Sequence, residues 1–122
     1  MRCIFCRIVA GEADRDMLFQ DEMTTAFRDI RPQAPTHVLI VPNSHVSSLE
    51  ELLDTDSSLL VRMFSKAHDV AEAAGIADKG YRLVINNGPD AGQVIDHLHL
   101  HLLGGKCMRP NDMSLRWKDE MA

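Results

Sequence analysis

The chain has 122 residues, of which 45% are hydrophobic and 25% are charged, values typical of one globular domain with its own core. The formal net charge is −5 and no basic cluster interrupts the sequence, so we expect no nucleic-acid partner. No apolar segment has the length of a membrane span, no signal peptide is recognisable, and three cysteines do not make a disulfide framework; these features predict a cytoplasmic protein with no membrane partner.

A short helix and a β-hairpin are predicted near the N-terminus. Apolar residues recur at helical spacing over 3–10, and Gly11 ends this stretch. Segments 17–20 and 24–27 flank a polar turn at 21–22, which is the pattern of two antiparallel strands.

A buried strand and the main helix follow. Two prolines make 31–35 a loop, and the apolar, β-branched segment 37–41 is predicted to be a strand. The main helix is expected over 54–75, with Thr55 or Asp56 as its N-cap. Its apolar stripe consists of Leu59, Leu60, Met63, Phe64, Ala67, Val70, Ala71 and Ala74.

The last third of the chain alternates between strands and polar segments. Residues 81–85 are predicted to form a strand, 86–93 a glycine-containing loop, and 97–103 a second strand. Residues 108–122 have little periodicity and form a tail beyond the core over 1–107. The elements together predict an α+β domain in which an antiparallel sheet carries one long helix.

Three histidines alternate with leucines at the start of the segment 97–103, and this histidine row is the strongest functional signal in the chain. Successive side chains of a strand point to opposite faces, so His97, His99 and His101 share one face and the leucines share the other. Because imidazoles titrate near neutral pH, the row is suited to metal binding, proton transfer or nucleophilic attack.

Two chemistries compete for the histidine row. Neighbouring histidines lie ~6.6 Å apart along a strand and can share one metal ion, but His97 and His101 are ~13 Å apart, so one ion does not hold all three. Alternatively, a neutral imidazole attacks a phosphorus atom and forms a phosphoramidate, which water then hydrolyses. The flanking histidines would stabilise charge on the phosphate and carry protons.

The pattern His-apolar-His-apolar-His-apolar-apolar resembles the signature of the histidine triad (HIT) family, and the resemblance extends over nearly the whole chain. It is most similar to the Hint branch, because a histidine stands at position 101 where the nucleotidyltransferase branch has glutamine. The other matching segments are 3–6, 27–30, 32–37, 42–45, 80–82, 86–88, 92–93 and 104–105.

The resemblance implies a single HIT domain over 1–122, with a five-stranded antiparallel sheet, one long helix and a short N-terminal helix. It also implies a homodimer that binds purine nucleotides (AMP or GMP) and hydrolyses the P–N bond of purine nucleoside phosphoramidates. No cofactor is needed for this chemistry.

The resemblance further implies a role for each site residue. His99 is the catalytic nucleophile that becomes nucleotidylated, His101 contacts the phosphate, and His97 flanks the nucleophile. Asp29 matches the acid that accepts the ribose hydroxyls. The remaining nucleotide-binding positions are Phe5, Ile8, Phe27 and Ile30 around the base and Asn86, Gly92, Gln93 and Val94 around the phosphate.

Val94 departs from the family pattern, in which many relatives carry serine, threonine or glutamate at this position. Valine can neither protonate a leaving amine nor bind a phosphate oxygen. Losing one such hydrogen bond in the transition state costs on the order of 10²-fold in rate, so we expect weak turnover with unchanged nucleotide binding.

Cys3 and Cys6 have the spacing of metal ligands, although such a pair also fits two small apolar residues in a first helical turn. Some bacterial HIT proteins complete a structural zinc site with the fourth family histidine and the first triad histidine, which are His45 and His97 here. His37 is expected to make a structural hydrogen bond and to take no part in chemistry.

The leading interpretation is therefore an enzyme, a nucleotidyl hydrolase of the Hint kind. The alternative is a nucleotide-binding or regulatory HIT protein with weak or no catalysis, which Val94 favours. A third interpretation, a metal-dependent hydrolase that uses the histidine row as ligands, would be excluded by activity that is insensitive to chelators.

Overall fold

The computed structural model describes residues 3–109 and confirms the predicted α+β class with a five-stranded antiparallel sheet. The described helices are α1 (Ile4–Val9), α2 (Leu49–Asp56), α3 (Ser58–Ala73) and the 3-10 helix η1 (Pro89–Ala91). The strands are β1 (Met17–Gln20), β2 (Thr24–Arg28), β3 (Thr36–Pro42), β4 (Tyr81–Ile85) and β5 (Leu100–Gly104). Most of the predicted tail, residues 110–122, lies outside the described residues.

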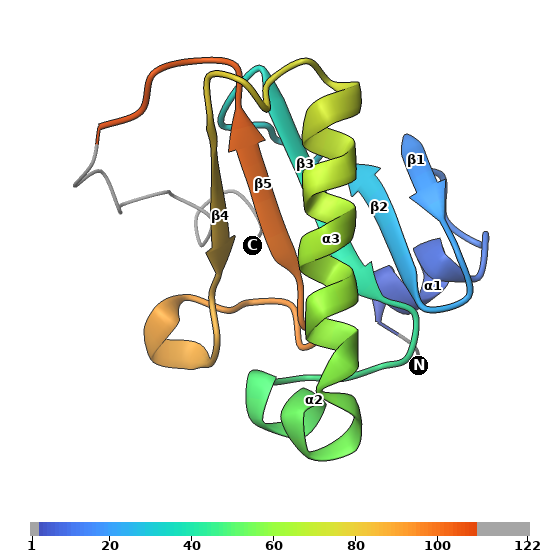
Figure 1. Ribbon diagram of the computed structural model, residues 1–122. Coiled ribbons are helices and arrows are strands. Elements are labelled where there is room, and N and C mark those ends of the chain that lie inside the picture. Colours follow the sequence, from blue (N-terminus) through green and yellow to red (C-terminus); the bar gives the residue numbers. More distant parts are fainter. Residues whose placement is uncertain (1–2, 110–122) are drawn as a thin grey trace.

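The sheet has the strand order β1-β2-β3-β5-β4, and every neighbouring pair is antiparallel. Helix α3 lies along one face of the sheet (Figure 1). Beneath α3 is a large apolar cluster, to which Leu98, Leu100 and Leu102 contribute. A second cluster joins α1 to the opposite face, and its buried members are Phe5, Ile8, Phe27, Leu39 and Val41. The sheet thus separates two apolar clusters.

The predicted N-terminal elements are confirmed. Helix α1 ends before Gly11, whose φ of +77° lies in the left-handed region that glycine adopts without strain. The hairpin turns at Asp21, whose Oδ1 accepts hydrogen bonds from the backbone N–H groups of Met23 and Thr24. This Asx-type turn closes the loop between β1 and β2.

The single helix predicted over 54–75 is in fact two helices, α2 and α3. The predicted N-caps Thr55 and Asp56 lie inside α2, so that part of the prediction is wrong. Ser48 caps α2 instead, because its hydroxyl accepts a hydrogen bond from a backbone N–H of the first turn. Leu52 is the one buried side chain of α2, and a helix with one buried residue has no apolar stripe to reveal it.

Helix α3 buries a narrower stripe than predicted. Leu59, Met63, Ala67 and Ala71 recur every four residues and are buried against the sheet. Phe64, which was predicted to belong to the stripe, is 40% exposed. Within residues 3–109, no helix is both long and apolar enough to cross a membrane.

The histidine strand is shorter than predicted, because regular pairing begins at Leu100 rather than at His97. The backbone N–H of Leu98 instead donates to the carbonyl of Val46, in the segment after β3. The predicted alternation still holds, since the leucines pack under α3 and the histidines lie on the other side.

Candidate active site and metal centre

The three histidines of the row are buried. Their exposed fractions are 0% for His97, 3% for His99 and 0% for His101. The Phe5 ring of α1 stands edge-on to His97 and His99, with centroid distances of 5.8 and 5.1 Å. The rings of His99 and His101 are 4.9 Å apart. Phe5 of α1 therefore covers His97 and His99, whereas His101 packs against His99 and His37.

Backbone carbonyls determine which nitrogen of two histidines carries the proton. His99 Nδ1 lies 2.8 Å from the carbonyl oxygen of His97, and a carbonyl only accepts, so Nδ1–H donates and the lone pair is on Nε2. His97 Nε2 lies 2.9 Å from the carbonyl oxygen of Pro42, so here Nε2–H donates and the lone pair is on Nδ1. Neighbouring histidines of one row thus offer different nitrogens for chemistry.

Burial keeps these imidazoles neutral. It lowers the pKa of His97 and of His99, because the charged form loses its hydration. Burial and the neighbouring His99 and His37 lower the pKa of His101 to about 2. At neutral pH the row therefore carries the lone pairs that a nucleophile or a metal ligand needs.

The lone pair of His97 points toward Cys3 and Cys6 at the start of α1. His97 Nδ1 lies 3.3 Å from Cys3 Sγ and 3.5 Å from Cys6 Sγ. His45 Nδ1 lies 3.5 and 3.2 Å from the same two sulfur atoms. The local fold brings the cysteines together, because Cys3 is the N-cap of α1 and its Sγ accepts the backbone N–H of Cys6.

This Cys₂His₂ cluster fits a tetrahedral zinc ion. Zinc binds sulfur at about 2.3 Å and imidazole nitrogen at about 2.0 Å, which places sulfur and nitrogen ligands roughly 3.5 Å apart at a tetrahedral angle. The four sulfur–nitrogen distances, 3.2 to 3.5 Å, are close to this value. The Pro42 carbonyl supplies the outer hydrogen bond that commonly orients a zinc-bound histidine.

His37 contacts the row, which the sequence analysis did not predict. Its Nε2 lies 3.0 Å from His101 Nδ1 and 3.5 Å from Asp29 Oδ2, and the ring is buried. His37 lies on β3 and His101 on the neighbouring β5, where Leu39 pairs with His101. The residues are 64 positions apart, so only knowledge of the strand pairing could have revealed this contact.

The predicted base-binding residues divide into two groups. Phe5, Ile8 and Phe27 are at most 1% exposed and belong to the cluster beneath α1. Ile30 is 64% exposed and lies next to Asp29, whose Oδ1 accepts a hydrogen bond from the backbone of the 31–35 loop. Ile30 is the member of this set that a ligand can contact without rearrangement.

The predicted phosphate loop is organised by Gln93. Its Oε1 accepts the backbone N–H of Gly88, and its Nε2 donates to the carbonyls of Ser47 and Ile95. The Gln93 amide thus holds the loop in place rather than extending from it. Gly92 has a φ of +87°, Asn86 is half-buried, and Val94 is 41% exposed.

The fold and the buried histidine row define a histidine triad protein. The chain belongs to the HIT family, because the model of the HIT domain matches residues 10–108. Purine nucleoside phosphoramidase of Escherichia coli K12 is 44% identical over 107 residues, which cover 88% of this chain and 90% of the relative.

Solved structures agree. A HIT family hydrolase from Legionella pneumophila has a TM-score of 0.86 and 45% identity, and the match covers 90% of this chain and 98% of that one. A zinc-bound histidine triad family protein from Mycobacterium smegmatis has a TM-score of 0.77 and 31% identity, and the match covers 93% of this chain and 81% of that one.

Proposed function

We propose that this HIT-family hydrolase cleaves the P–N bond of purine nucleoside 5′-phosphoramidates, that is, amines linked to AMP or GMP. The observation that carries the proposal is the orientation of His99, whose Nδ1–H is held by the His97 carbonyl and whose Nε2 lone pair is therefore available. The name of the E. coli relative supports the substrate class.

The reaction has two steps. Nε2 of His99 attacks the phosphorus atom as the P–N bond breaks, and the leaving amine takes a proton from solvent water, so that a nucleotidyl-histidine remains. Water then attacks the phosphorus atom and gives one proton back to solvent, the bond to Nε2 breaks, and the nucleoside monophosphate and a neutral imidazole are released. His101 stabilises charge on the phosphate oxygens in both steps, and no cofactor takes part.

The ribose would contact the Asp29 carboxylate, which is 7% exposed, and the base would lie over the exposed Ile30. A carboxylate at this position can accept the two vicinal hydroxyls of a ribose, and the exposed Ile30 offers an apolar contact to the base. Phe5, Ile8 and Phe27 would form the rigid wall behind this site, because they are already packed together. The backbone around Gly92 would contact the phosphate.

The assay that tests the proposal uses adenosine 5′-phosphoramidate and follows AMP formation by phosphorus NMR. We expect turnover that is unchanged when a chelator is present during the assay. Binding of AMP at micromolar affinity without turnover would instead favour the nucleotide-binding alternative. Turnover that stops at once on chelation would favour the metal-dependent interpretation.

A structural zinc ion is the second part of the proposal. Cys3, Cys6, His45 and His97 would hold it, and its role would be to fix α1 over the histidine row. The zinc-bound relative from M. smegmatis supports this assignment. A cytoplasmic location, which we also propose, would keep the cysteines reduced and able to bind the metal.

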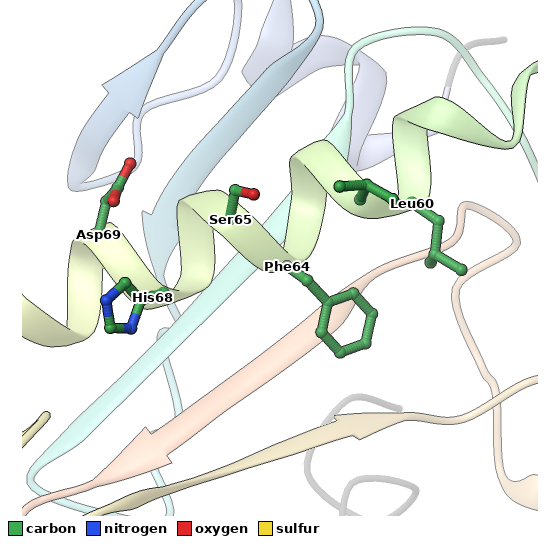
Figure 2. A pocket seen from close by; sticks show the side chains of 6 residues that line it. Leu60, Phe64, Ser65, His68 and Asp69 are labelled. Atoms are coloured by element: carbon green, nitrogen blue, oxygen red, sulfur yellow. The ribbon is translucent and has the colours of Figure 1, made fainter.

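Two adjoining surfaces support a homodimer. Within the described residues β4 pairs with β5 alone, so its other edge is open. On α3, Val61 is 67% exposed, and Leu60, Phe64 and His68 project from the helix into a shallow hollow (Figure 2). His68 Nδ1 lies 3.1 Å from the hydroxyl of Tyr81, so the hollow adjoins β4. We propose that a second copy of the chain covers both surfaces.

Val61→Glu is expected to separate the dimer. A carboxylate buried in an apolar interface without a partner costs several kcal/mol, which raises the dimer dissociation constant more than ~10²-fold. Size-exclusion chromatography with light scattering measures the effect. Arg62→Glu is the control, since Arg62 faces the acidic residues of the β1–β2 turn and should leave the dimer intact. A wild-type monomer at micromolar concentration contradicts the assignment.

Val94→Ser is expected to raise kcat, by up to about 10²-fold, because it restores a hydroxyl near the leaving amine. The affinity for AMP should stay unchanged, since the side chain lies on an exposed part of the loop. Val94→Ala is the control, because it shortens the side chain without adding a hydroxyl. Equal kcat values for the serine and alanine variants would count against a role for this position.

A further inference from the structure

Asp29, His37 and His101 form a buried chain of polar side chains beside the histidine row. His37 Nε2 lies 3.0 Å from His101 Nδ1 and 3.5 Å from Asp29 Oδ2. The side chain of Asp29 is 7% exposed, and that of His37 is fully buried. These three side chains therefore connect the carboxylate proposed to bind the sugar, Asp29, with the imidazole proposed to bind the phosphate, His101.

The direction of the hydrogen bonds in this chain follows from one backbone group. The N–H of Gln33 donates to His37 Nδ1 at 3.1 Å, so this nitrogen is an acceptor and the proton of neutral His37 is on Nε2. That Nε2–H donates to His101 Nδ1, so the proton of neutral His101 is on its Nε2. His101 thus offers an N–H donor, rather than a lone pair, at Nε2.

The single Nε2 proton of His37 has two acceptors within reach, His101 Nδ1 and Asp29 Oδ2. A carboxylate that accepts hydrogen bonds from ribose hydroxyls is a weaker competitor for that proton, because part of its charge is already compensated. A bound ribose therefore strengthens the bond from His37 to His101. Without sugar hydroxyls, the Nε2 proton of His37 is shared between His101 and the Asp29 carboxylate, so the hydrogen bond that orients the His101 ring is weaker.

We propose that His37 is a positioning residue that links sugar recognition to the chemical step. The proposal rests on the function proposed above. Through His37 the enzyme discriminates between ribose and deoxygenated sugars in kcat as well as in binding. The contact with Asp29 and the contact with His101 are both required, because the coupling passes through one shared proton.

The kinetic test compares adenosine 5′-phosphoramidate with its 2′,3′-dideoxy analogue. For the wild type we expect the analogue to raise KM and to lower kcat by about 10-fold. His37→Leu should lower kcat for the ribose substrate by about 10- to 100-fold, because His101 loses the donor that orients it. In this variant the two substrates should have equal kcat values and still differ in KM.

His37→Gln is the matched variant. The side-chain nitrogen of glutamine can reach the position of Nε2, and it carries two protons instead of one. It can therefore donate to His101 and to Asp29 at the same time. We expect it to restore kcat for the ribose substrate to near the wild-type value while the dependence of kcat on the sugar stays absent.

Nitrogen NMR of the histidine rings tests the hydrogen-bond chain without turnover. In the wild type, His37 and His101 should both carry their proton on Nε2, and a proton on Nδ1 of His101 would overturn the inference. The inference would also be overturned if the wild type turned over both substrates and the difference in kcat between the ribose substrate and the dideoxy analogue persisted in His37→Leu or His37→Gln. A wild type that hydrolyses neither substrate contradicts the proposed function instead. In that case the positions of the ring protons still decide whether Asp29, His37 and His101 are linked by the hydrogen bonds described above.

Discussion

His99→Ala is expected to lower kcat by about 10⁴-fold or more, because it removes the nucleophile and with it the covalent route. AMP should still bind, since Asp29, Ile30 and the loop around Gly92 are unchanged. Steady-state turnover of adenosine 5′-phosphoramidate measures the loss. Mass spectrometry after rapid quenching should detect one nucleotidyl group on the wild type and none on the variant.

The matched control for this prediction is His68→Ala. His68 is a histidine of α3 that lies outside the buried row, on the surface proposed for the dimer, so its removal should leave the covalent intermediate in place. If His99→Ala accumulated the nucleotidylated form, or kept more than a tenth of the wild-type kcat, another residue would have to be the nucleophile.

Removal of zinc is expected to have the largest effect on stability. Protein purified without chelators should contain about one zinc per chain by elemental analysis. An ion that binds only the folded state adds about 4 kcal/mol when its free concentration is 1,000 times Kd. Stripping it should therefore lower the Tm by roughly 10 to 20 °C in a domain of this size, as measured by calorimetry.

Cys6→Ser and Cys107→Ser form the variant pair for this experiment. Cys6 lies within 3.5 Å of both candidate histidine ligands, whereas Cys107 is an exposed thiol near the end of the described residues. The first variant should lose the zinc and the associated stability, and the second should keep both. Wild-type protein that contains no zinc would refute the metal centre.

The sheet was predictable because its signals are local. Alternation along 97–103 identified which residues face α3, and Asp21 marked the hairpin turn. Helix α2 was not predictable as a separate helix, because Leu52 alone anchors it to the core. A helix that buries one side chain owes its position to tertiary contacts and caps, which leave no periodic pattern in the sequence.

The candidate site was predictable only in part. The spacing of the histidine row and of the two cysteines is visible within single segments. The contact between His37 and His101 depends on the register of β3 against β5, which no short segment encodes. The same is true of the carbonyls of Pro42 and His97, which determine the protonated nitrogen of two histidines.

The separation of the two apolar clusters by the sheet has an evolutionary consequence. In the segment that leads into β5, neighbouring residues have different roles. Leu98 and Leu100 pack beneath α3 and contribute to the core, whereas His97 and His99 face α1 and belong to the candidate site. Substitutions among the leucines can adjust thermal tolerance through packing under α3, and the surroundings of the imidazoles stay the same. A lineage that adapts to a new temperature can therefore change one side of this segment and inherit the chemistry of the other.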